Sequence, residues 1–283
     1  MRRRRHGGRR VQLREKTTIV NAITASVVRG LKSIAPRIYL QGLSDCDALG
    51  ERLLLDAPSA EVLLDVGCGD GKKTMRWWSA ARAKRCVGLE FVSSEIDASR
   101  ARGIDARKTD LSTTWPVADD ECDLVISSQN IEHMHRTLFY AREMFRVLRP
   151  GGRALVLTEN LSGWANVIAL ACGWQPFSSA PIDGAILGCP LAHLADVELE
   201  RFSELGEAFE AGIVGAAAHV CVLAYQGLFD VMRTTGFEVL TYRTTGYSPF
   251  WGWPSRGLCR LDPRHGHFLV MEARKPHEAP QRV

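Results

Sequence analysis

The stretch LLDVGCGDG, residues 63–71, decides the fold of this 283-residue chain. It begins as a buried strand and then offers three glycines, which permit a tight turn close to a ligand before a helix begins. Glycine-rich turns between a strand and a helix are typical of nucleotide-binding α/β sheets. Asp65 and Asp70 disfavour a pyrophosphate, however, and favour a cationic ligand.

Strand-like and helix-like segments alternate after this turn. Apolar runs at EVLLDVG, RCVGLEF, GIDARKTD, CDLVISS and GRALVLTEN alternate with segments of helical character at 71–82, 93–102 and 138–148. This pattern predicts a parallel sheet covered by helices on both faces. A helix at 224–235 and the strands FEVLTYR and HFLVMEARK complete a doubly wound α/β domain.

Two acidic residues follow later strands. Glu90 ends the second strand, where a carboxylate can accept both hydrogen bonds from a ribose diol. Asp110 follows the third strand, where it can accept a hydrogen bond from an adenine amino group or form an Asx turn within TDLS. The ligand that fits these positions is a cationic nucleoside.

Together with SSQNIEH (127–133) and RVLRPGG (146–152), these motifs resemble, in order and spacing, the class I S-adenosylmethionine-dependent methyltransferases of the bacterial small-molecule type. The resemblance covers residues 61–160. It implies a Rossmann-like seven-stranded sheet with an antiparallel last strand, and S-adenosylmethionine as cofactor. We expect the cofactor-binding residues to be Asp65, Gly67, Cys68, Gly69, Asp70, Gly71, Glu90, Phe91, Asp110, Leu111, Ser128 and Gln129.

The function this resemblance implies is methyl transfer to O or N of a small-molecule acceptor by in-line displacement. The candidate catalytic residues are His133, for which a structural role is the alternative, and His219. The candidate substrate-binding residues are His135, Glu159, Trp164 and Tyr247. His133 and His135 with Glu159 are the candidate metal ligands, but the two histidines converge only loosely and no carboxylate cluster accompanies them, so we expect no metal site.

The rest of the chain divides into segments of different composition. Residues 1–16 predict a disordered basic tail, and 17–57 predict N-terminal helices over 19–35 and 45–56. The domain then occupies 58–283. Its fifth strand is followed by an insertion of about 161–222, far longer than an ordinary connection, which we interpret as a lid or a substrate wall.

The positive net charge of the chain, +4, comes from its N-terminal tail. Residues 1–16 contain seven Arg and one Lys against one Glu, so the remaining residues sum to −3. A nucleic-acid methyltransferase and a membrane-surface enzyme, each using the Arg-rich tail, therefore remain as alternatives to the small-molecule enzyme. A third alternative is a non-catalytic cofactor-binding module.

Cysteine usage and hydropathy bear on localisation. Eight cysteines occur singly without a C-x-x-C pair, which indicates reduced thiols, and apolar runs are too short to cross a membrane. We expect a soluble cytoplasmic protein without a transmembrane segment, for which a homodimer is one possible state.

Overall fold

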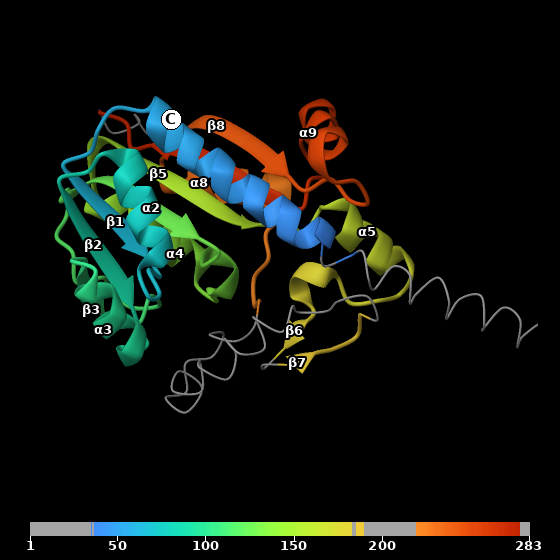
Figure 1. Ribbon diagram of the computed structural model, residues 1–283, viewed down its shortest axis with the longest axis horizontal. Coiled ribbons are helices and arrows are strands. Elements are labelled where there is room, and N and C mark those ends of the chain that lie inside the picture. Colours follow the sequence, from blue (N-terminus) through green and yellow to red (C-terminus); the bar gives the residue numbers. More distant parts are fainter. Residues whose placement is uncertain (1–34, 36, 183–184, 190–218, 278–283) are drawn as a thin grey trace, which may run out of the picture.

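The computed structural model describes residues 35, 37–182, 185–189 and 219–277, which include a seven-stranded sheet in the order β3-β2-β1-β4-β5-β9-β8 (Figure 1). All neighbouring strands are parallel except at β9, which runs antiparallel to both β5 and β8. This confirms the doubly wound sheet with an antiparallel last strand. The strands are β1 (Val62–Val66), β2 (Arg85–Glu90), β3 (Asp105–Lys108), β4 (Cys122–Ser128), β5 (Leu148–Glu159), β8 (Glu238–Thr245) and β9 (Phe268–Arg274).

The strand order reverses at β1. The chain proceeds from β1 outward through β2 and β3, and then returns to β4 on the other side of β1. The connections after β1 and β4 therefore leave in opposite directions and open a crevice beyond the carboxyl ends of these strands. This is the edge of the sheet where the glycine turn and the SSQNIEH segment lie.

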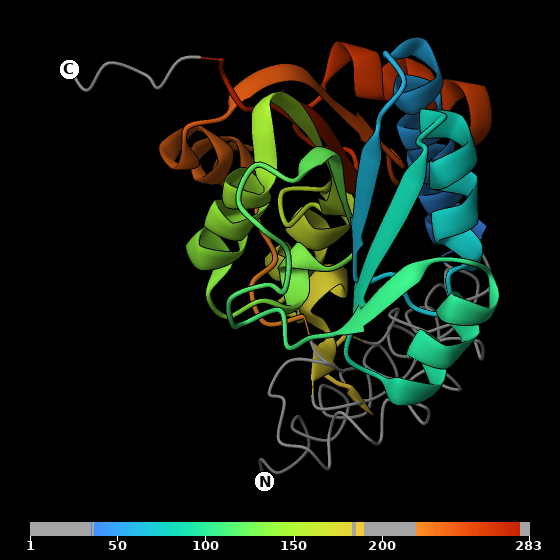
Figure 2. The same ribbon diagram turned by 90° about the vertical axis from the view of Figure 1, so that its left-hand side faces the viewer.

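Helices cover both faces of the sheet, as Figure 2 shows from the side. One apolar layer packs Cys46 of a helix over residues 37–56, and Trp77 of α2, against the sheet. The other layer packs Met144 of α4 and Met232 of α8. The other helix bounds are α2 (Lys72–Ala81), α3 (Ser93–Ala101), α4 (Thr137–Val147), α5 (Trp164–Ala171), α8 (Tyr225–Thr235) and α9 (Gly252–Leu261).

The helix over residues 37–56, called the N-terminal helix below, begins earlier than expected. Its sequence pattern predicted a start at residue 45. The additional turns pack on the end of β9: the ring of Tyr39 lies 5.3 Å from that of Phe268, and a Cβ on Gly42 would come within 2.9 Å of Gly246 Cα. Tertiary packing therefore extends the helix. The expected helix over 19–35 and the basic tail lie outside the described residues, apart from residue 35.

The insertion after β5 contains regular structure that its Trp-, Gly- and Pro-rich composition did not predict. It begins with α5, continues through the 3-10 turn η2 (Phe177–Ser179) and reaches a short hairpin of β6 (Pro181–Ile182) and β7 (Ala185–Ile186). Helix α9 was likewise not predicted. Residues 190–218 of the insertion lie outside the described residues, so its interpretation as a lid stays a prediction.

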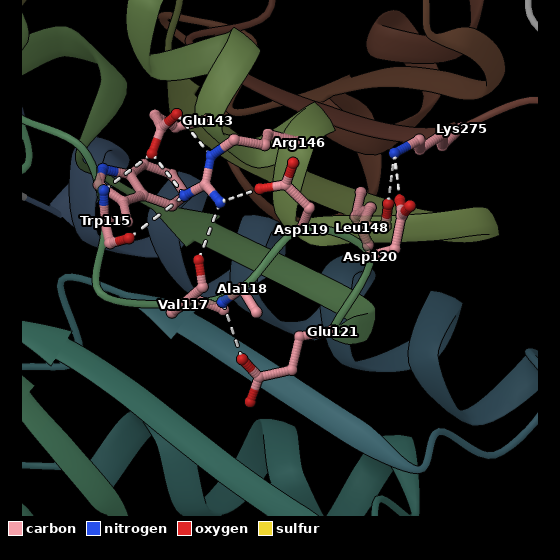
Figure 3. A network of polar contacts seen from close by, with 10 residues as sticks. All are labelled: Trp115, Val117, Ala118, Asp119, Asp120, Glu121, Glu143, Arg146, Leu148 and Lys275. Carbon is pink, nitrogen blue, oxygen red and sulfur yellow. Dashed lines mark hydrogen bonds and ion pairs between the residues drawn. The ribbon is translucent and has the colours of Figure 1, made fainter.

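One arginine holds the loop between β3 and β4 in place (Figure 3). Arg146 of α4 donates to the carbonyl oxygens of Trp115 and Val117 and forms ion pairs with Asp119 and Glu143. Glu143 in turn accepts a hydrogen bond from the Trp115 backbone. This network fixes the loop that begins at the predicted adenine-binding residues.

Among the helices of the described ranges, none combines the length and the apolar character that a membrane crossing requires.

Candidate functional site

The glycine turn after β1 adopts the left-handed backbone that its sequence predicted. Gly67, Gly69 and Gly71 have φ angles of 74°, 53° and 81°. A Cβ on Gly67 would lie 2.2 Å from Oδ1 of Asn130, so the turn also needs a residue without a side chain for steric reasons. The Gly67 amide donates to the carbonyl oxygen of Leu89, which ties the turn to β2.

Asp65 lies beneath this turn, and Thr74 Oγ1 donates to its carboxylate over 2.6 Å. Burial raises the pKa of Asp65 to about 7, although the Thr74 hydrogen bond and the charge of Lys73 act in the opposite direction. A cationic ligand nearby would favour the ionised form. Burial also raises the pKa of Cys68 to about 12, which keeps its thiol protonated. Asp70 instead forms an ion pair of 2.7 Å with Lys72.

Glu90, at the end of β2, is hydrogen-bonded to the glycine turn. One carboxylate oxygen accepts a hydrogen bond from the Gly69 amide at 2.9 Å, and the other accepts from the Phe91 and Val92 amides. The oxygen bonded to Gly69 accepts only this one hydrogen bond, so it keeps a second lone pair that a ribose hydroxyl can use. The neighbouring Phe91 ring lies 5.4 Å from the Lys108 ammonium.

Asp110 forms an Asx turn, one of the two arrangements that its sequence allows. Its Oδ1 accepts hydrogen bonds from both the backbone and the hydroxyl of Ser112. Leu111 packs against the core layer under α4 and α8. Contact of either residue with an adenine edge stays a prediction.

Lys73 of α2, a residue that sequence reasoning missed, reaches the end of β4. Lys73 donates to Ser128 Oγ at 3.0 Å and forms an ion pair of 2.7 Å with Asp47 of the N-terminal helix. Gln129 follows with a φ of 55°, and its buried amide nitrogen has no hydrogen-bond acceptor among the described residues. An orphaned donor at this edge is a group that a ligand can satisfy.

The two predicted catalytic histidines meet. The ring centroids of His133 and His219 lie 4.8 Å apart, although the residues are far apart in sequence. Two backbone hydrogen bonds bring them together, because the amides of Val220 and Cys221 donate to the carbonyl oxygen of Glu132. His219 Nδ1 lies 2.7 Å from the carbonyl oxygen of Ser178.

Glu159, predicted to bind substrate, joins this pair from the end of β5. Its Oε2 lies 3.7 Å from His219 Nδ1, and the Tyr39 hydroxyl donates to its Oε1 at 2.9 Å. Burial acts to raise the pKa of Glu159, but His219 and the buried His267 outweigh it and leave this pKa below its ordinary value. Tyr39 carried no sequence signal for this role, since it belongs to a helix that precedes the domain.

Glu132 is a further member that sequence reasoning missed, although it stands in the quoted SSQNIEH. It is 0% exposed, and its Oε2 accepts a hydrogen bond of 2.8 Å from Thr158. Burial raises the pKa of Glu132 to about 7. The signal available in the sequence was its position beside His133.

The remaining predicted substrate-binding residues are exposed or have other partners. His135 is exposed. Trp164 Nε1 donates to the Tyr247 hydroxyl at 2.7 Å, and that hydroxyl donates to Asp262. The polar groups of Trp164 and Tyr247 thus bond to each other and to Asp262, and binding of substrate by them stays a prediction.

Residues 64–156 match the methyltransferase domain family. The chain contains a class I S-adenosylmethionine-dependent methyltransferase domain. A probable S-adenosylmethionine-dependent methyltransferase of Mycolicibacterium smegmatis is 37% identical over 100 residues, which are 35% of this chain and 38% of that protein. The tRNA (carboxymethyluridine(34)-5-O)-methyltransferase of Macaca fascicularis is 32% identical over 102 residues, 35% of this chain and 15% of that protein.

These matches span less than half the length of either relative and about a third of this chain. The solved structure of an S-adenosylmethionine-dependent methyltransferase from Mesorhizobium loti superposes with a TM-score of 0.51 at 18% identity, covering 82% of this chain and all of that one. That likeness shows the fold.

The residues of the methyltransferase domain fit its cofactor. S-adenosylmethionine carries a sulfonium and an ammonium cation, and the crevice presents Asp65 and Glu90 beside a turn in left-handed backbone. The orphaned Gln129 amide adds a donor at the same edge. The Gly67–Gly71 turn would hold the methionyl part, and Glu90 the ribose.

Proposed function

We propose that this protein transfers the methyl group of S-adenosylmethionine to an oxygen or nitrogen of a small-molecule acceptor. The observation that carries the proposal is the meeting of His133, His219 and Glu159 at the ends of β4 and β5. This cluster adjoins the Ser128–Gln129 segment on the cofactor side. The net charge of −3 outside the tail supports a small acceptor over a polyanionic one.

Methyl transfer requires alignment above all, because the sulfonium is a good leaving group. The lone pair of the acceptor attacks the methyl carbon in line with the breaking carbon–sulfur bond. Holding the two reactants in this geometry can supply about 7 to 11 kcal/mol. The crevice would hold the cofactor at one end and the histidine cluster would meet the acceptor at the other.

Deprotonation of a hydroxyl acceptor is the second requirement. A carbonyl oxygen only accepts hydrogen bonds, so the contact with Ser178 requires a proton on His219 Nδ1. When the ring is neutral, its lone pair therefore lies on Nε2. Such a lone pair can take the proton of the acceptor directly, an effect of about 100- to 10,000-fold, or hold a cation that acidifies the acceptor.

The test is a product screen with the full chain. The protein is incubated with methyl-labelled S-adenosylmethionine and separate pools of small metabolites, tRNA and anionic vesicles, and labelled products are identified by mass spectrometry. We expect label in a small metabolite and its loss in His219→Ala. His277→Ala, on the exposed opposite edge, is the matched control. Label in tRNA or lipid alone would refute the acceptor class, and cofactor binding without transfer to any pool would favour a binding module.

A further inference from the structure

We propose that Glu132, His133 and His219 bind a divalent transition-metal ion at the acceptor end of the crevice. One oxygen or nitrogen atom from each residue lies within 4.8 Å of the other two. Three atoms at that spacing surround a point about 2.8 Å from each, so inward shifts of about 0.7 Å give the metal–ligand distances of 2.0–2.2 Å that zinc sites show.

The groups around these side chains hold them as metal ligands are held. Histidine ligands usually donate their second ring N–H to a backbone carbonyl or a carboxylate, and ligating carboxylates are themselves hydrogen-bonded. His219 Nδ1 donates to the carbonyl oxygen of Ser178, which leaves Nε2 as the ligating atom. Thr158 Oγ1 donates to Glu132 Oε2.

The other oxygen of Glu132 is the second independent sign of a ligand. Glu132 is 0% exposed, and nothing among the described residues hydrogen-bonds to its Oε1. A buried carboxylate oxygen without a partner is costly, and a bound cation removes that cost. The same carboxylate that carries this oxygen is hydrogen-bonded to Thr158 and lies beside the imidazoles of His133 and His219.

The ligand set selects the kind of metal. Two imidazoles and one carboxylate suit Zn²⁺, Mn²⁺ or Fe²⁺, whereas Mg²⁺ and Ca²⁺ prefer oxygen ligands alone. Three protein ligands also leave at least one coordination position for another molecule, as in catalytic rather than structural sites. The proposal departs from the expectation of no metal, which considered His133 and His135 with Glu159 and left out Glu132.

The open position gives the ion a role in catalysis, and this step rests on the proposed function. A hydroxyl oxygen of the acceptor that binds the metal loses its proton to water more readily, because the cation stabilises the alkoxide. The oxygen then forms a bond to the methyl carbon while the carbon–sulfur bond breaks. Its electron pair stays on sulfur, and S-adenosylhomocysteine leaves. The substrate class is therefore a hydroxyl compound.

Metal binding is measured on the full chain without cofactor or acceptor. Protein dialysed against a chelator is titrated with Zn²⁺ in a calorimeter. The absorption spectrum of the Co²⁺-loaded protein then identifies the ligand atoms, and we expect bands of nitrogen and oxygen ligation without thiolate bands. We expect about one equivalent of metal. Glu132→Gln and His219→Ala should each weaken binding by more than about 100-fold, and Thr158→Val, which removes only the orienting hydroxyl, by about 10- to 100-fold.

The controls separate this inference from a folding defect and from the proposed function. Thr158→Val is nearly isosteric, so it tests the site even if a ligand variant fails to fold, and His277→Ala should bind metal as the parent does. Absence of Zn²⁺ binding, or equal affinity in a folded His219→Ala variant, overturns the metal site. Metal binding without any methyl transfer supports the site and overturns the proposed function, whereas full turnover after chelation supports the proposed function and overturns the catalytic role of the ion.

Discussion

Asp65 should couple cofactor binding to pH. Burial raises its pKa to about 7 in the unliganded protein, and the cations of S-adenosylmethionine favour the ionised form. Near pH 6 about a tenth of the molecules carry the charge, and near pH 8 about nine tenths do. We therefore predict that affinity for S-adenosylmethionine rises about tenfold across this range, equivalent to about 1.4 kcal/mol.

Asp65→Asn is the matched perturbation. The amide oxygen of Asn can still accept the hydrogen bond from Thr74, so the fold should persist, and near-ultraviolet circular dichroism checks this. Calorimetric titrations at several pH values then compare the two proteins. The variant should retain only the dependence that comes from the amino group of the cofactor itself. An equal slope in both proteins would refute the assignment of the proton to Asp65.

The raised pKa of Asp65 also predicts how the stability of the folded protein changes with pH. Between pH 3.8, the ordinary pKa of the group, and about 7, the folded protein keeps the Asp65 proton while the unfolded chain has lost it. The contribution of Asp65 to stability therefore falls as pH rises through this window. Urea unfolding of the unliganded parent and Asp65→Asn should diverge there, and parallel pH profiles would contradict the buried position.

Three further predictions concern single contacts. Glu90→Gln should weaken cofactor binding by about 10- to 100-fold, since charged hydrogen bonds contribute about 1.5–3 kcal/mol each; unchanged calorimetric affinity would exclude the ribose role. Arg146→Met should lower the free energy of unfolding by about 2 kcal/mol, because it leaves the buried Glu143 carboxylate without its partner, and unchanged urea midpoints would contradict this. Gly42→Ala should destabilise by about 1–3 kcal/mol despite the better helix propensity of Ala, because its Cβ meets Gly246 at 2.9 Å; stabilisation would disprove that close approach.

Where local pattern sufficed, sequence and structure agree. The turn after β1 needed only consecutive glycines after an apolar strand, and the Glu90 position follows from the length of the next helix and strand. The Asx turn at Asp110 was one of two local options. Each of these features depends on residues within one supersecondary unit.

The segments that local pattern misjudged depend on packing instead. Helix α9 contains Trp, Gly and Pro, which weaken the helical signal, and α5 begins at a tryptophan. The first turns of the N-terminal helix pack against distant segments, where Gly42 approaches Gly246 and Tyr39 contacts Phe268. Propensity is a weak guide in such segments, because tertiary contacts supply most of the stability of a short helix.

The sequence by itself determined the doubly wound sheet, because alternating apolar runs and a glycine turn are local signals. The antiparallel last strand followed only from the resemblance of the motifs to a known family. Only the tertiary structure decided which side chains share the acceptor end. Tyr39 reaches Glu159, and His219 reaches His133 and Glu132, through backbone contacts between segments far apart in the chain. Spacing along the sequence does not predict such contacts, because they depend on how loops fold back over the strand ends.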